Sequence, residues 1–207
     1  MALILAACSS ETTPKSDVTP GVSVYGSSFY WLASSNFESY SIERVNQPTT
    51  KCGTGIWQAH CEVKSIDFSS LSSDPDEAAA WLTGLDRHGA MVEGRLTEAT
   101  LFVSEYWKPL VPTFFTIDAP VYLTQAIECP AGNCNQARVL NSIDSKNFSS
   151  MDFGPFALVA PADLLKIAED LAFSMDGLVF SATPAAADDL IKLLPIQIYL
   201  PQSEIPF

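Results

Sequence analysis

The order of short motifs in the first half of the chain recurs in the second half, and this internal repeat constrains the fold more than any single motif. Five segments of the first half have a counterpart in the second: residues 29–32 match 114–117, 44–46 match 138–141, 66–69 match 151–154, 90–94 match 177–180, and 101–103 match 196–200. In both halves a helix, expected to start at residue 75 or 161, lies between the third and fourth of these segments. Two prolines, Pro109 and Pro112, discourage a continuing element between the halves. We therefore expect a first repeat over residues 24–110 and a second over residues 111–207.

The composition of these segments predicts the α+β class. Runs rich in Val, Ile, Phe and Tyr indicate strands, and few helices lie between them. Asp74 before Pro75 is typical of a helix start, and Gly89 can end that helix. A third, short helix is expected over residues 185–194. We expect two similar units, each a mainly antiparallel sheet with one helix packed on it.

Residues 1–8 resemble the end of a bacterial lipoprotein signal peptide, with residues 5–8 as the lipobox. Small residues before Cys8 would admit a signal peptidase, and the Cys8 thiol would then carry the lipid. A complete signal has a basic segment and a longer apolar stretch, so we expect an upstream start or a trimmed chain. The alternative is a buried strand with an incidental cysteine. Residues 9–23 are mostly polar and predict a flexible tether.

The remaining four cysteines form two local pairs. Cys52 and Cys61 close one loop, and Cys129 and Cys134 flank a Pro-Ala-Gly-Asn turn signal. We expect two disulfides, which would persist in a periplasm or outside the cell. The alternative is a zinc site that uses Cys52, His60, Cys61 and one distant ligand.

These cysteine-flanked segments carry a family resemblance. The matching residues are 44–52, 60–67, 129–134, 137–142 and 176–179. They resemble an uncharacterised family of bacterial secreted proteins and lipoproteins with two cysteine-containing repeats, and the resemblance spans residues 25–183. It implies an exported, disulfide-stapled pair of repeats and supplies no catalytic residues. Members often carry a further cysteine pair ahead of the Val-Asn strand, whereas residues 35–41 contain none.

The sequence offers little catalytic chemistry. It has no Gly-x-Ser-x-Gly elbow and no nucleotide-binding glycine loop. Asp67 and Asp152 hold equivalent places in the two halves and could form an acid–base pair, but aspartates that cap turns are the favoured interpretation. We expect no catalytic residues, no cofactor and no resident metal. With 24 acidic residues against 11 Lys and Arg, the net charge of −13 argues against nucleic acid as a partner.

Trp57 and His60 are the candidate binding residues, because both lie in the Cys52–Cys61 loop among glycines and polar residues, where burial is least expected. We expect a non-enzymatic lipoprotein, held by Cys8 on the outer-membrane or periplasmic face of a bacterial envelope, or secreted. Its partner would be an envelope protein or a cell-wall component. The alternatives are an inhibitor that presents this loop to a secreted protease, and a hydrolase that uses Asp67 and Asp152.

Overall fold

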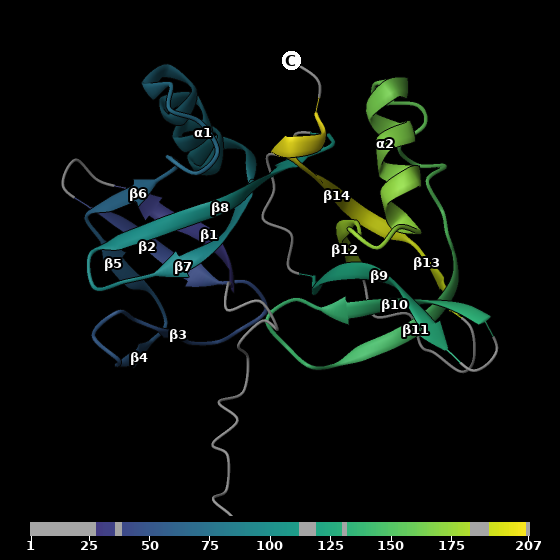
Figure 1. Cartoon of the computed structure of the whole chain (residues 1–207), viewed down its shortest axis with the longest axis horizontal. Helices are drawn as coiled ribbons and strands as arrows, with labels where there is room; N and C mark the ends of the chain where they lie inside the picture. The colour runs from purple at the N-terminus through teal and green to yellow at the C-terminus, as the bar shows by residue number, and fades with distance from the viewer. Residues whose placement is uncertain (1–27, 36–38, 112–118, 130–131, 183–190, 206–207) are drawn as a thin grey trace, which may run out of the picture.

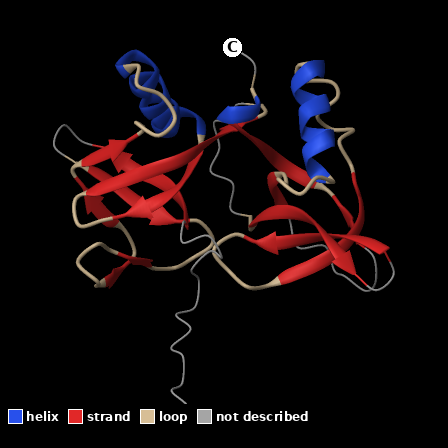
Figure 2. Cartoon of the chain, viewed as in Figure 1, coloured by secondary structure: helices blue, strands red, loops and turns tan. Residues whose placement is uncertain are grey.

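The computed structural model describes residues 28–35, 39–111, 119–129, 132–182 and 191–205 (Figure 1). This described part of the chain is mostly β, with 47% strand and 17% helix. Twelve strands belong to one sheet that runs through both halves of the chain (Figure 2). The α+β prediction of two units, each with its own sheet and one helix packed on it, is therefore wrong.

The sheet has the order β13-β11-β10-β9-β12-β14-β8-β7-β1-β2-β5, and β6 pairs with β8 off this path. The first part of the chain supplies β1 (Ser28–Ser35), β2 (Tyr40–Arg44), β5 (Cys61–Val63), β6 (Ser65–Asp67), β7 (Met91–Leu96) and β8 (Thr100–Pro109). The second part supplies β9 (Val121–Cys129), β10 (Gly132–Val139), β11 (Ser145–Met151), β12 (Val179–Ala182), β13 (Ile191–Leu193) and β14 (Pro195–Pro201). The short strands β3 (Thr50–Lys51) and β4 (Trp57–Gln58) form a separate hairpin.

The pairing of β8 with β14 makes the sheet continuous. These two strands lie antiparallel, with Pro109 opposite Tyr199 and Trp107 opposite Pro201. Almost every residue of β14 is buried, so this strand is covered on both faces. Two separate sheets would each leave an apolar edge open to water and to aggregation. Pairing the two edges removes that cost, and it joins segments that the sequence places about 90 residues apart.

Two α-helices lie within the described residues, α1 (Pro75–His88) and α2 (Ala162–Ala172). Helix α1 begins as predicted, because the Asp74 carboxylate accepts the backbone N–H of Asp76 at 2.9 Å. It ends at Gly89, whose φ of 63° is the left-handed conformation that glycine favours. Helix α2 directly follows Pro161, also as predicted.

The expected third helix is wrong at its C-terminal end. Residues 185–190 of that prediction lie outside the described residues. Ile191–Leu193 form strand β13, which runs parallel to β11. The carbonyl of Leu193 accepts the N–H of Asp152 at 2.9 Å, so pairing with β11 determines this conformation. The prolines that bracket the segment in sequence fit either structure.

The described core consists of three apolar clusters. One contains Trp81 and Leu85 of α1, and another contains Ala168, Leu171 and Ala172 of α2. The third, which we call the central cluster, draws corresponding positions from both halves of the chain. Its buried members are Phe29 and Val121, Val45 and Leu140, Met91 and Val179, and Trp107 and Tyr199.

Two asparagines with left-handed backbones connect the halves beside the central cluster. Asn46 (φ 60°) accepts the N–H of Val121 at 2.8 Å and donates to the carbonyls of Val121 and Leu140. Asn141 (φ 57°) makes the equivalent bonds to the N–H and carbonyl of Phe29 and to the carbonyl of Val45. The partner predicted for Phe29 lay in residues 114–117, outside the described residues; Val121 holds the equivalent position.

Candidate functional site

The strongest candidate site is the hairpin closed by Cys52 and Cys61, which we call the stapled hairpin (residues 50–61). The predicted disulfide is confirmed, with Cα atoms 5.4 Å apart. Inside it, Lys51 lies opposite Trp57. The N–H of Cys52 donates to the carbonyl of Ile56 at 2.8 Å, and the N–H of Gly55 donates to the carbonyl of Cys52 at 2.7 Å. The disulfide and these backbone bonds together fix the shape of the hairpin.

The base of the stapled hairpin is held in the core. Cys61 is only 1% exposed and belongs to β5, while Thr50 is fully buried. The Thr50 hydroxyl accepts the N–H of Arg44 at 2.8 Å. Gly53 lies directly against the backbone of Thr97, in the turn between β7 and β8, where a Cβ would be 2.1 Å from the Thr97 carbonyl carbon. The base therefore has little freedom to move.

The tip of the stapled hairpin is exposed to solvent. All residues from 54 to 60 are exposed, including two large apolar side chains, Ile56 (58% exposed) and Trp57 (45% exposed). Trp57 thus lies where the sequence argument expected it. Ile56 was missed, although an aliphatic residue between Gly55 and Trp57 in a stapled loop is a readable signal. A fixed base and an exposed apolar tip suit the site to bind an apolar socket.

His60, the second candidate, lies at the side of the tip. Its Nδ1 is 3.3 Å from the Glu43 carboxylate of the neighbouring strand β2, and the two side chains are 52% and 39% exposed. An exposed pair of this kind contributes little to stability. It can orient the imidazole at the side of the tip.

The structure excludes the zinc alternative at this position. Both Cys52 and Cys61 are used in the disulfide, so neither can supply a thiolate to a metal. Within the described part of the chain, no three His, Cys, Asp or Glu side chains are grouped as a metal site would require.

The structure does not describe the side chains of two further predicted sites. Cys8, the expected lipid-bearing residue, lies outside the described residues. The side chains of Cys129 and Cys134 are likewise not described, although the backbones of β9 and β10 pair around them, with Cys129 opposite Gly132 and Cys134 opposite Ile127. The lipid on Cys8 and the second disulfide stay predictions.

The structure does not bring Asp67 and Asp152 together. Asp67 ends β6 beside β8, whereas Asp152 follows β11, five strand steps away in the sheet order. The two strands lie on opposite sides of the molecule in Figure 1, so the two carboxyl groups cannot share a proton. They form no acid–base pair.

Each aspartate instead caps a turn. The carboxylate of Asp67 accepts the N–H of Ser69 at 2.8 Å, and this bond lowers the pKa of Asp67. The pKa of Asp152 is lowered first by Lys192, whose Nζ lies 2.7 Å from Oδ2, and then by the N–H of Gly154 at 2.9 Å. Both groups are held ionised, as turn-capping carboxylates are.

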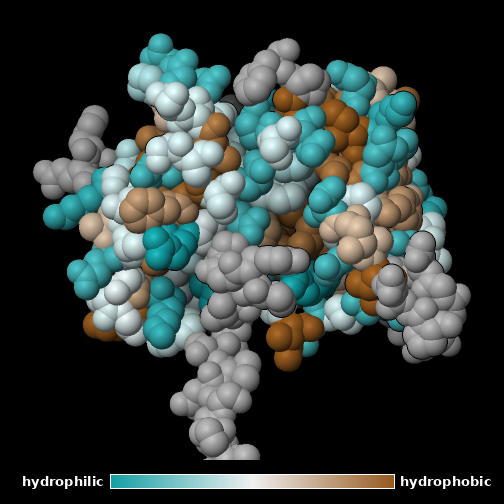
Figure 3. Space-filling view, viewed as in Figure 1, coloured by the Kyte–Doolittle hydropathy of each residue, from teal (hydrophilic) through white to brown (hydrophobic). Residues whose placement is uncertain are grey.

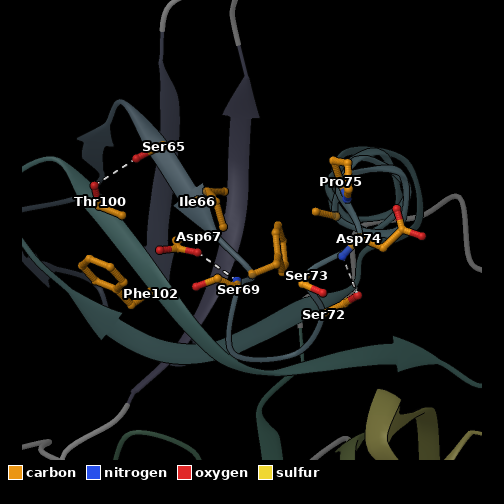
Figure 4. A pocket seen from close by; sticks show the side chains of 12 residues that line it. Ser65, Ile66, Asp67, Ser69, Ser72, Ser73, Asp74, Pro75, Thr100 and Phe102 are labelled. Atoms are coloured by element: carbon orange, nitrogen blue, oxygen red, sulfur yellow. Dashed lines mark hydrogen bonds between the residues drawn. The ribbon is translucent and has the colours of Figure 1, made fainter.

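A shallow hollow of about 490 Å³ lies between β6 and the start of α1 (Figure 4). Its walls combine exposed Phe102 with hydroxyls and two carboxylates; the polar lining residues are Ser65, Asp67, Ser69, Ser72, Ser73, Asp74 and Thr100. The Ser65 and Thr100 hydroxyls lie 2.9 Å apart, and the Ser72 hydroxyl accepts the N–H of Asp74 at 3.0 Å. These groups organise the approach to α1 and do not place a nucleophile beside a base.

We compared the chain with protein families, curated proteins and solved structures. No family model matches the chain, and no curated protein or solved structure matches it. No helix in the described part of the chain is long and apolar enough to cross a membrane.

Proposed function

We propose that this protein is a non-enzymatic binding module of the bacterial cell envelope, tethered by a lipid on Cys8, and that the stapled hairpin recognises a partner protein. The observation that supports this most is the pairing of a rigid base with an exposed tip. Ile56 and Trp57 are 58% and 45% exposed, on a loop whose base includes the buried Cys61 and Thr50.

The energetics of binding favour such a loop. A flexible loop must lose conformational freedom when it binds, whereas a stapled hairpin has already lost most of it. Trp is among the residues that most often dominate binding free energy at protein interfaces. Burying Ile56 and Trp57 in a partner would remove apolar surface from water without unfolding any part of the sheet.

The local charges favour a protein over a charged polymer as the partner. Lys51 lies opposite Trp57 on the paired strand and Glu43 lies beside His60, so the two formal charges next to the tip have opposite signs. The tip thus offers apolar contacts and little net charge. Its complement is an apolar socket, a feature of folded proteins.

The envelope location rests on the chain's cysteines. A disulfide between Cys52 and Cys61 suits an oxidising compartment. The lipobox at residues 5–8 and the polar tether at residues 9–23 would hold the sheet a short distance from a membrane.

Site-specific cross-linking in the native cells tests this proposal. A photoreactive phenylalanine at Thr54, an exposed tip position, should form an adduct with one partner that mass spectrometry can identify. With that partner purified, Trp57→Ala should weaken binding at least 30-fold, while Gln58→Ala, at its exposed neighbour, should change it less than threefold. An adduct that forms equally well when Ile56→Ser and Trp57→Ala are combined would overturn the proposal.

An inhibitor of a secreted protease is the second candidate, because the same disulfide closes an exposed loop that could enter an active-site cleft. The cross-linking result separates the two. If the adduct is a protease, near-stoichiometric inhibition that Trp57→Ala abolishes supports the inhibitor.

A further inference from the structure

The segment between β11 and α2 is a second exposed apolar feature, distant from the stapled hairpin. Residues 154–161 read Gly-Pro-Phe-Ala-Leu-Val-Ala-Pro, with no polar or charged side chain. We call this segment the apolar loop. Phe156 is 5% exposed and fixes the loop to the core, whereas Leu158 and Val159 are 92% and 63% exposed. Figure 3 shows apolar side chains gathered over the half of the molecule that carries α2.

The fold does not require this composition, as the corresponding loop before α1 shows. Residues 69–74 also follow a turn capped by an aspartate, and Leu71 and Ser72 both donate their N–H to the carbonyl of Phe68. Phe156 and Ala157 donate to the carbonyl of Phe153 in the same way. Yet the first loop reads Ser-Ser-Leu-Ser-Ser-Asp. A similar backbone thus accepts hydroxyl side chains, so packing does not account for the exposed Leu158 and Val159.

Most of the backbone N–H groups in the apolar loop donate to nearby acceptors. The N–H groups of Phe156, Ala157, Val159 and Ala160 all donate to carbonyls within residues 153–156. Pro155 and Pro161 have no N–H to satisfy, and the N–H of Gly154 donates to Asp152. Moving an amide N–H out of water is costly when it lacks a partner, and these N–H groups avoid that cost.

We propose that the apolar loop inserts Leu158 and Val159 into the surface of an uncharged lipid bilayer. A bilayer interior offers no hydrogen bonds, and the loop has no side chain that needs one. The charge of −13, with Asp163 in the first turn of α2, disfavours anionic lipid surfaces. In Figure 1, helix α2, which follows the apolar loop, lies at the upper right, and strands β3 and β4 of the stapled hairpin lie at the lower left. Binding of the apolar loop to a membrane would therefore leave the stapled hairpin accessible.

Vesicle flotation with the full chain carrying Cys8→Ser tests this inference without any contribution from a lipid anchor. The protein should float with phosphatidylcholine vesicles. Leu158→Ser/Val159→Ser copies the hydroxyl chemistry of the first loop and should lower the partition coefficient at least tenfold. Ile143→Ser is the matched control, because Ile143 is 87% exposed in another turn, and it should bind like the parent. Circular dichroism should show both variants folded, because all three side chains are exposed.

Charge provides a second readout. Replacing half of the phosphatidylcholine with phosphatidylglycerol should weaken binding at low salt, and added salt should restore it. No flotation of the parent protein, equal flotation of the double-serine variant, or stronger binding to the anionic vesicles at low salt would each overturn the inference. The stapled hairpin is unchanged throughout, so these outcomes are independent of the proposed function.

Discussion

Replacing Asn141 with alanine is expected to destabilise the protein by about 3–5 kcal/mol. The change leaves the N–H of Phe29 and the carbonyl of Val45 without their partner, at 3.0 and 2.9 Å, and each buried orphan costs about 1–3 kcal/mol. The carbonyl of Phe29 keeps a second donor, the N–H of Val45 at 3.0 Å, so it adds little. Alanine at φ 57° adds about 1 kcal/mol of backbone strain.

Guanidinium unfolding followed by tryptophan fluorescence measures this loss, since Trp107 lies in the central cluster. Asn141→Gly is the control that separates the two terms: it removes the same bonds but no strain, and should cost about 1 kcal/mol less than alanine. Asn46→Ala should cost less than Asn141→Ala because Asn46 is only partly buried, so water can replace its bonds. A loss below about 1 kcal/mol for Asn141→Ala would refute the reasoning.

Three further predictions concern the stapled hairpin and the capped turns. Cys52→Ala/Cys61→Ala should lower the free energy of unfolding by about 2–3 kcal/mol through loop-closure entropy, and adding reductant to that variant should cause no further loss at this loop. Gly53→Ala should cost about 1–3 kcal/mol because its Cβ would meet the Thr97 backbone, whereas Gly55→Ala, with open space but a φ of 84°, should cost about 1 kcal/mol. A smaller loss for Gly53→Ala than for Gly55→Ala would contradict this account of how the base is held. Lys192→Met should raise the pKa of Asp152 in an NMR titration and leave that of Asp67 unchanged. Because the folded pKa of Asp152 is lowered, its stabilising contribution is present above about pH 4 and is lost as the pH falls through the folded value.

Local signals in the sequence were enough to predict the helix starts and the first disulfide. Asp74 and Pro75 define the start of α1 through their own chemistry, with Gly89 at its end, and these features do not depend on distant contacts. Cys52 and Cys61 are close in sequence, so the hairpin between them brings the sulfurs together. The exposure of Trp57 followed from its polar surroundings in the same loop.

The sheet could not be predicted from local signals. The strands β10 and β11 are rich in polar residues, such as Asn135 and Gln136 in β10 and Asn147 in β11, so they lack the alternating apolar pattern of a half-buried strand. Their partners in the sheet determine their conformation. The pairing of β8 with β14 likewise joins two strands that lie about 90 residues apart in the sequence, so no local signal indicates it.

Of the two proposed interaction surfaces, the sequence indicated the stapled hairpin but not the apolar loop. Trp57 was found because aromatic residues in stapled loops are conspicuous. The apolar loop was missed because Phe156, Leu158 and Val159 have the composition of a core segment, and only the three-dimensional structure shows that Phe156 alone is buried. Composition gives the hydrophobicity of a segment, whereas exposure depends on how the segment is oriented against the sheet.

The envelope assignment is tested most directly by the intact mass of the protein extracted from its native membranes, measured before and after reduction. The account predicts loss of residues 1–7, a lipid on Cys8, and a gain of two hydrogens for each disulfide reduced. An unlipidated chain with free thiols would contradict it, because neither the membrane tether nor the stapled hairpin would then exist in the cell.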